Sequence, residues 1–134
     1  MATQVLQLKR QYRDLDLNFN IHPVRKDVTK HISEMAVINS IKNLILMNHY
    51  EKPFQPDIGS NVRKLLFENL DVVTAMSIER EIKQVIKNYE PRATVQGISV
   101  SPDYDNNGFG VTIEFSVNNV SNPITISFLL ERTR

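Results

Sequence analysis

Residues 88–94 read "NYEPRAT", and this stretch marks the point where the chain changes from helical to extended structure. Proline disfavours the helical conformation of the residue before it, so the preceding helix must end near Tyr89 and Glu90 must be extended. A carboxylate here faces the negative end of the helix dipole, which is unfavourable. We therefore expect a positive side chain to lie close to Glu90.

The segment that leads into this turn has the periodicity of an amphipathic helix. A helix from about Thr74 to Tyr89 is predicted, with Glu79 and Lys83 as a favourable exposed pair one turn apart. Its apolar residues recur every three or four positions: Ile78, Ile82, Val85, Ile86 and Tyr89. This periodicity predicts that one face of the helix is buried.

Two further helices are predicted nearer the N-terminus. Residues 34–48 carry apolar side chains at helical spacing, and Ser33 is a suitable N-cap. Ser60 is a suitable N-cap for a second, short helix. The buried side of this short helix is predicted to comprise Val62, Leu65 and Leu66. Between the two, residues 50–60 contain prolines and a glycine, which predict a structured loop.

After the turn the period changes from helical spacing to alternation. Residues 93–101, 111–117 and 124–130 are predicted to be strands, with Gly97 marking a bulge and Asn107-Gly108 forming a hairpin turn. Helices that precede strands indicate an α+β fold. We expect three helices packed on one face of a three-stranded antiparallel meander, whose other face is polar.

The length of 134 residues fits one domain. Residues 27–134 are predicted to form this single α+β domain. Residues 1–26 are predicted to be an N-terminal arm that is partly extended, because Leu15, Leu17 and Phe19 alternate with polar residues.

The composition argues against several classes of partner. The 16 Lys and Arg residues nearly balance 15 Asp and Glu residues, and no basic stripe is present beyond Lys9, Arg10 and Arg13, so nucleic acid is not expected as a partner. The chain has neither a signal-like N-terminus nor an apolar run that could span a bilayer, so no membrane is expected. The absence of cysteine excludes disulfides and thiolate chemistry, and fits synthesis in a reducing compartment.

The sequence offers little enzymatic chemistry. His22, His31 and His49 do not have metal-ligand spacing, and no phosphate loop, nucleophile elbow or dinucleotide motif is present. We therefore expect no metal, no cofactor, no small-molecule substrate and no catalytic residue. Sequence spacing does not exclude that two acids meet as a glycosidase pair. The candidates are Glu51, Asp57, Glu68, Glu79, Glu90 and Asp103, most of which are predicted to be solvated.

Glu90 and Arg92 are two residues apart in an extended segment, so their side chains leave the same side of the backbone. Two interpretations remain open. The pair can be a local ion pair that finishes the helix, which would contribute roughly 0 to 1 kcal/mol if exposed. Alternatively, a partner protein can bury both charges and use them to fix the register of an interface.

Three motifs together resemble a known family. "KPFQPDIG" at 52–59, "LFEN" at 66–69 and "NYEPR" at 88–92, which leads into the strand meander, are similar to the small baseplate wedge protein, or sheath initiator, of contractile-tailed phages. The corresponding baseplate component of type VI secretion systems belongs to the same group. The resemblance extends from about residue 27 to residue 130.

The resemblance implies a structural protein of the virion, located in the baseplate of the tail and assembled in the cytoplasm of the bacterial host. It implies that Glu90, Pro91 and Arg92 dock onto other baseplate wedge proteins around the tail tube, which is a further candidate partner. It also implies that the sheet accepts a strand from tail sheath subunits, a form of β-augmentation. The expected edge is the last strand, with Ile124, Ile126 and Phe128.

The alternatives are a type VI secretion baseplate component and a lysozyme-like peptidoglycan hydrolase, a description that some members of the family carry. The chain also departs from the family pattern. It has Tyr50-Glu51-Lys52 where Gly-Glu-Arg is usual, and Ile58 where an aromatic residue is common. Lysine cannot form the bidentate contacts of arginine, so no family contact is carried over to Lys52.

Overall fold

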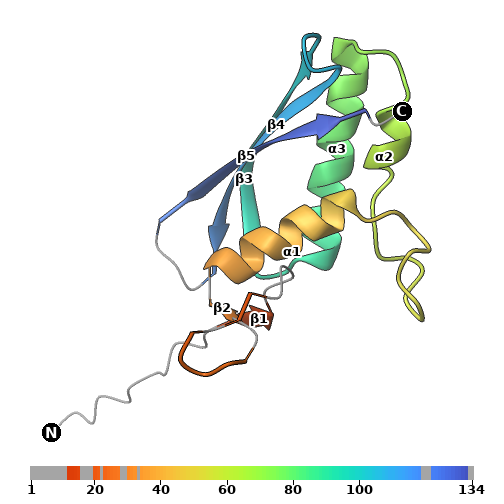
Figure 1. Ribbon diagram of the computed structural model, residues 1–134. Helices are drawn as coiled ribbons and strands as arrows, with labels where there is room; N and C mark the ends of the chain where they lie inside the picture. Colours follow the sequence, from red (N-terminus) through yellow and green to blue (C-terminus); the bar gives the residue numbers. More distant parts are fainter. Residues whose placement is uncertain are drawn as a thin grey trace, which may run out of the picture.

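The computed structural model describes residues 12–15, 20–21, 23–27, 30–32, 34–118 and 122–132, and of residues 30–32 it describes the backbone only. The elements follow in the order β1 (Arg13–Leu15), β2 (Lys30–Ile32), α1 (Glu34–Leu46), α2 (Val62–Leu65), α3 (Val72–Tyr89), β3 (Ala93–Asp103), β4 (Gly108–Val117) and β5 (Ile124–Glu131). Figure 1 shows three helices beside a sheet formed by the last three strands. The predicted α+β class, with helices before strands, is confirmed.

The main sheet is an antiparallel meander in the order β3-β4-β5. Its register between β4 and β5 is regular, with Ile113 opposite Ile126, whereas the register between β3 and β4 shifts between Val95 and Gly97. The predicted bulge at Gly97 is therefore confirmed. A second, two-stranded sheet pairs β1 with β2. The predicted extended segment overlaps β1 at Leu15, while Leu17 and Phe19 lie outside the described residues.

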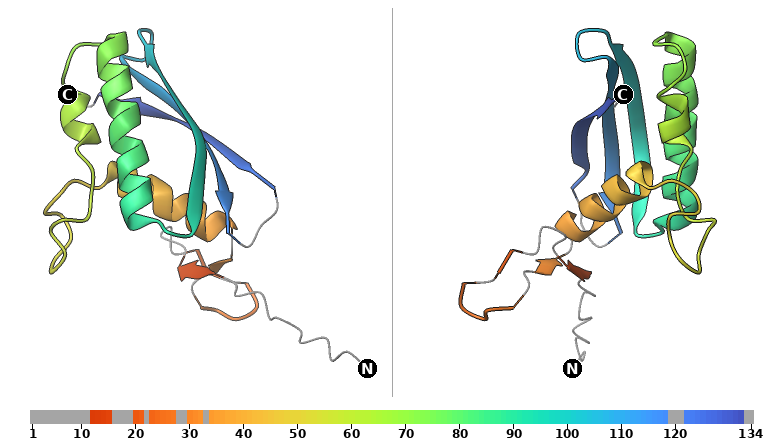
Figure 2. Two further views of the ribbon diagram at one scale, coloured as in Figure 1. Left: turned by 180° about the vertical axis from the view of Figure 1, so that it is seen from behind. Right: turned by 45° about the vertical axis from the view of Figure 1, so that its right-hand side comes forward.

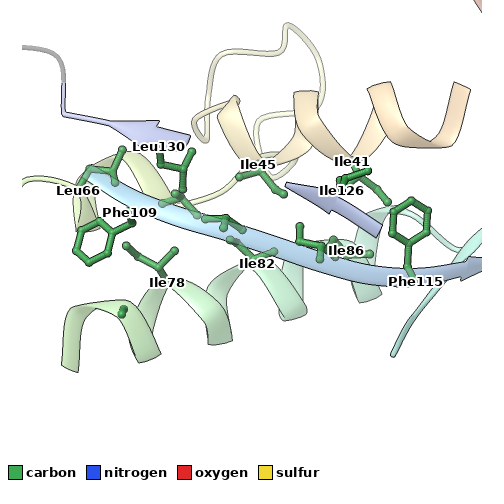
Figure 3. Close-up of a cluster of buried hydrophobic side chains, with 14 of the residues drawn as sticks. Ile41, Ile45, Leu66, Ile78, Ile82, Ile86, Phe109, Phe115, Ile126 and Leu130 are labelled. Atoms are coloured by element: carbon green, nitrogen blue, oxygen red, sulfur yellow. The ribbon is translucent and has the colours of Figure 1, made fainter. Parts of the chain in front are cut away.

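The core lies between the helices and one face of the sheet. The buried residues of β4 alternate from Phe109 to Val117, so they all face the same side. Figure 3 shows α1 and α3 contributing isoleucines to this layer, and Figure 2 shows α3 as a layer beside the sheet. Each fully buried large apolar side chain contributes about 1.5 to 3 kcal/mol. On the opposite, polar face the hydroxyls of Thr112 and Ser127 lie 3.1 Å apart.

The helix ends differ in detail from the prediction. α1 ends at Leu46, two residues early, and the predicted cap Ser33 lies outside the described residues. The N-cap position of α2 is Asn61 and not Ser60. The Ser60 hydroxyl donates to the carbonyl of Ile45 at 2.6 Å and accepts from the N–H of Val62 at 3.4 Å, so it contacts the ends of both α1 and α2. The last carbonyls of a helix lack partners within it, and Ser60 satisfies one of them at the end of α1.

α3 begins two residues before the predicted Thr74, at Val72. The side chain of Asp71 accepts a hydrogen bond from the backbone N–H of Thr74 at 2.7 Å, which makes Asp71 the N-cap. Among the described residues, no helix combines the length and the apolar composition that a membrane span requires.

Candidate functional site

The corner between α3 and β3 carries the predicted docking residues. α3 ends at Tyr89, and the N–H of Glu90 still donates to the carbonyl of Ile86 at 2.9 Å. Asn118, which follows β4, holds the next two residues: its backbone N–H donates to the carbonyl of Arg92 and its side-chain amide to the carbonyl of Pro91, both at 3.1 Å. The backbone of the corner is therefore fixed by β4 as well as by its own turn.

A positive side chain does lie at Glu90, as expected from the unfavourable helix dipole. Nε of Arg92 donates to Oε1 of Glu90 at 2.6 Å, and Nη2 donates to Oε2 at 2.8 Å. This bidentate geometry is the strong form of an arginine–carboxylate contact. It fixes the plane of the guanidinium group.

Glu90 is buried, and the prediction of a mostly solvated set of acids is wrong for this residue. Its exposed fraction is 2%, against 23% for the side chain of Arg92. Ser40 of α1 also donates a hydrogen bond to the Glu90 side chain. Glu90 is buried because α1 packs over the end of α3. The sequence pattern around Pro91 gives no indication of this contact, because α1 is distant in the sequence.

The outer side of Arg92 meets the N-terminal segment. Nη1 of Arg92 lies 3.6 Å from Oδ2 of Asp14 in β1, and the guanidinium carbon lies 5.2 Å from the ring centroid of Tyr12. The second contact is within the range of a cation–π interaction. Arg92 therefore links the corner to the segment that precedes the predicted domain.

Both members of the pair are charged at neutral pH. Burial raises the pKa of Glu90, but the hydrogen bonds from Arg92 and Ser40 and the charge of Arg92 outweigh burial, so the pKa lies below its ordinary value of 4.5. The hydrogen bond to Glu90 raises the pKa of Arg92, against the effect of burial.

The outer edge of β5 is the second predicted site. The N–H of Arg132 donates to the carbonyl of Asn107 at 3.3 Å, in register with the β4–β5 ladder. Successive residues of an antiparallel strand direct their main-chain N–H and C=O groups alternately toward the partner strand and away from it. The even-numbered residues of β5 therefore bond to β4, as Arg132 does, and Thr125, Ser127 and Leu129 direct their main-chain groups outward. Ile124, Ile126 and Phe128 thus bond within the sheet, and Figure 3 shows Ile126 facing α1.

A groove of about 160 Å³ with a mixed apolar and polar lining lies beside the C-terminal part of β5. Its apolar walls include Leu46 at the end of α1, Phe67 after α2 and Leu129 of β5. Arg132 lines one side and donates to the main-chain carbonyls of Leu66 and Glu68, which fixes the end of β5 to the α2 segment. These hydrogen bonds join residues that are more than sixty positions apart in the sequence, and no sequence pattern predicts them.

The remaining acids have ordinary local roles. Glu51 accepts hydrogen bonds from the backbone and side-chain nitrogens of Asn48, both at 2.9 Å, and Asp103 accepts from the N–H groups of Asp105 and Asn106 in the β3–β4 turn. The shifted carboxylates of the described part of the chain, Glu51, Asp71, Glu90 and Asp103, all have a lowered pKa. A general acid needs a raised pKa.

The histidines form no metal site within the described residues, where no three His, Cys, Asp or Glu side chains gather. His22 lies outside the described residues, as does the side chain of His31. Nδ1 of His49 lies 3.1 Å from the carbonyl oxygen of Asp57, inside the loop that precedes α2.

Several solved structures share the fold of this chain. One is a "putative tail lysozyme" from Geobacter sulfurreducens, with a TM-score of 0.68, 20% identity, and coverage of 75% of this chain and 92% of that chain. A chain of the anti-feeding prophage (AFP) baseplate has a TM-score of 0.63 and 18% identity, covering 89% of this chain and 84% of that one. A chain of the postcontracted pyocin R2 baseplate has a TM-score of 0.55 and 11% identity, covering 89% and 99%.

The sequence comparison identifies the family. The family described as "Baseplate wedge protein gp25" matches residues 32–121. Baseplate wedge protein gp25 of Enterobacteria phage T4 is 33% identical over 116 residues, which cover 87% of this chain and 86% of the T4 protein. This chain therefore belongs to the baseplate wedge protein gp25 family, and the resemblance predicted from the three motifs is confirmed.

Proposed function

We propose that this chain is a non-enzymatic subunit of a contractile-tail baseplate that docks on other wedge proteins and starts the tail sheath. The observation that carries the proposal is the outer edge of β5, where Thr125, Ser127 and Leu129 direct main-chain groups away from the sheet. An edge of this kind is a template for pairing with another chain. A strand of a tail sheath subunit would complete the ladder and so seed the sheath.

The groove beside β5 supports this proposal. A strand added next to β5 would present alternate side chains to the helix-covered face, where Leu46 and Phe67 flank the groove and are exposed. Apolar side chains of the sheath strand would fill it, while main-chain hydrogen bonds would supply much of the affinity. The inward side chains of Ile124, Ile126 and Phe128 would hold β5 on the helices during this exchange.

In docking on the wedge proteins, Pro91 and Arg92 would contact the partner, and Glu90 would position Arg92. Pro91 is exposed and rigid, and Arg92 directs two of its five N–H donors at Glu90. Glu90 is buried and would act by holding the guanidinium plane rather than by touching a partner. A carboxylate or carbonyl group of a neighbouring wedge protein near the tail tube would accept from the donors of Arg92 that Glu90 and Asp14 leave unused.

The test replaces one outward donor of β5. Ser127→Pro removes the N–H that faces the partner, while Ser127→Ala keeps it and serves as the control. Proline at Ile126 is unsuitable, because this residue is only 8% exposed and bonds to β4. In cells that produce the tail, Ser127→Pro should give baseplates without sheath in electron micrographs, and Ser127→Ala should give full sheaths. Sheaths of normal length on baseplates that contain the proline variant would refute the proposal.

The same site would serve a type VI secretion baseplate in the bacterial cytoplasm, and neighbouring genes separate the two cases. Capsid and tail-fibre genes accompany only a phage tail.

The hydrolase alternative is favoured by the fold shared with the Geobacter protein, although that likeness lies at 20% identity. Against it, the hydrogen bonds from Arg92 and Ser40 and the charge of Arg92 outweigh the effect of burial and leave Glu90 with a lowered pKa, which is unsuited to protonating a leaving group. A zymogram on peptidoglycan with the purified chain decides between them. Clearing that disappears when one carboxylate is substituted would establish the hydrolase.

A further inference from the structure

The loop of residues 48–60 between α1 and α2, here called the aromatic loop, extends away from the helices and the sheet in all three views (Figures 1 and 2). Residues 50–57 are exposed without interruption. Phe54, near the tip, has an exposed fraction of 101%, and Tyr50, Pro53 and Pro56 lie around it in the loop. The loop therefore displays a cluster of aromatic and proline side chains.

Hydrogen bonds at its base and within it hold the aromatic loop in one shape. The N–H of Ser60 donates to the carbonyl of Met47 at 2.8 Å, and the N–H of Tyr50 donates to the carbonyl of Pro56 at 2.9 Å. The hydroxyl of Tyr89 donates to the carbonyl of Asp57 at 2.7 Å. The exposed position of Phe54 is thus built into a fixed scaffold, which lowers the entropy lost on binding.

The backbone of the loop is strained at both aromatic residues. Tyr50 has φ of 70° and Phe54 has φ of 67°, which is the left-handed region that bulky residues avoid. A glycine would adopt either conformation without penalty. Aromatic side chains at these two positions oppose stability, which points to a use for the side chains themselves.

We propose that Phe54 inserts into an apolar pocket of a different polypeptide of the baseplate, and that a carboxylate at the rim of this pocket pairs with Lys52. Glu51 is engaged by Asn48 and lies 3.9 Å from Arg63, whereas Lys52 forms no ion pair with the described residues. The loop therefore presents one exposed aromatic ring, and Lys52, two residues before it, is a positive charge that also lines a hollow shared with α1 and β1. Buried aromatic anchors of this kind dominate the energetics of interfaces.

A second copy of this chain is a poor partner for the aromatic loop. The groove beside β5 has Arg63 and Arg132 on its walls against the single acid Glu131, so its rim would repel Lys52. The charge complement of the tip is an acidic rim, and this requires a different surface. The inference is separate from the roles proposed for β5 and for Arg92.

The first experiment maps the contact in assembled particles. Full-length chains that carry benzoylphenylalanine at position 54, or at position 104 as a control, are produced in cells that assemble the tail, and purified particles are irradiated. Tyr104 is also an exposed aromatic residue, 70% exposed, in the β3–β4 turn. Position 54 should cross-link to another polypeptide at a site with apolar residues and an Asp or Glu. Cross-links to a second copy of this chain, or no greater yield at position 54 than at position 104, would overturn the inference.

The second experiment measures incorporation into particles. Phe54→Ser and Lys52→Glu should reduce incorporation about tenfold, the change that about 1.4 kcal/mol produces, while Lys52→Arg and Tyr104→Ser should not. Thermal unfolding of the purified variants should be close to that of the wild type, because both side chains are exposed. Unchanged incorporation of Phe54→Ser would overturn this inference alone. Absence of the wild-type chain from particles would overturn it together with the proposed function.

Discussion

Arg92 and Glu90 form a bidentate contact in which Arg92 is partly exposed to solvent and Glu90 is buried. Nε of Arg92 lies 2.6 Å from Oε1 of Glu90, yet Arg92 keeps 23% of its side chain exposed and Glu90 keeps 2%. If the contact is broken, the guanidinium can turn to water and the carboxylate cannot. The two partners are therefore not equivalent in their effect on stability.

We expect Arg92→Gln to destabilise the domain more than Glu90→Gln does. In Arg92→Gln the buried charge of Glu90 loses its ion pair and keeps only the hydrogen bond from Ser40, an effect of about 3 kcal/mol. In Glu90→Gln the new amide keeps hydrogen bonds, and the charge of Arg92 that is left can be hydrated, so the effect is about 1 kcal/mol. Urea unfolding at pH 7 measures both. Domains usually have 5 to 15 kcal/mol of stability, so both variants should still fold. Equal losses would show that the exposure of Arg92 is irrelevant.

The contribution of Glu90 to the pH dependence of stability should change sign when Arg92 is replaced by glutamine. The pKa of Glu90 is lowered in the folded chain, so its contribution is fully present above the unfolded value near 4.5 and is lost as the pH falls through the folded value. In Arg92→Gln, burial without the guanidinium should raise the pKa above 4.5. The variant should then lose stability relative to the wild type as the pH rises from 4 to 7. A constant difference in unfolding free energy over this range would contradict the assignment.

Gly59→Ala should destabilise the domain by about 2 kcal/mol or more. Gly59 has φ of 147°, and a Cβ atom there would lie 2.6 Å from the carbonyl carbon of Asn48, which is too close for real contacts. Gly110→Ala is the control, because its Cβ would lie 3.5 Å from the nearest atom, Oγ of Ser101. Thermal unfolding compares the two. If Gly110→Ala lowers the stability as much as Gly59→Ala, the close approach of Asn48 to position 59 is not the cause of the loss.

Asp71→Ala should lower the stability of the domain, while Asp71→Asn should retain most of it. The carboxylate of Asp71 caps α3 through the N–H of Thr74, and an asparagine side chain can accept the same hydrogen bond. Urea unfolding measures both variants. If the two substitutions are equally harmful, the charge of Asp71 matters and the hydrogen bond does not.

Phe54→Gly should be more stable than Phe54→Ala by about 1 kcal/mol. Both variants lose the ring, so the difference isolates the strain at φ of 67°, which glycine relieves and alanine does not. The melting temperatures of the two purified variants provide the measurement. If they coincide, the loop backbone relaxes without its aromatic residue, and the argument from strain fails.

The local patterns predicted most of the fold. The helical spacing of Ile78 and Ile82 and the alternation of Ile113 and Phe115 each identified a buried face, because these periods follow from backbone geometry. Gly97 marked the bulge in β3. Such signals are carried by neighbours in the sequence, so a single chain is sufficient to read them.

The candidate site depended on contacts between distant residues. The burial of Glu90 follows from α1 and Ser40, fifty residues away, so the sequence predicted the ion pair but not its environment. Ser60 was predicted to be the N-cap of α2, whereas the cap position is Asn61, and the hydrogen bond from Ser60 to Ile45 at the end of α1 has no signal in the local spacing. The motifs identified the family, whereas the docking roles of Pro91, Arg92 and β5 remain predictions.

The two outer strands of the main sheet are not alike. β3 is interrupted at the irregularity between Val95 and Gly97, which blunts its outer side, whereas β5 runs in unbroken register with β4. A unit that is to be repeated in a stack needs a surface for the copy below and another for the copy above. This domain offers a regular ladder on one side only, so we expect it to sit at the terminus of such a stack and to give the structure that grows from it a single direction.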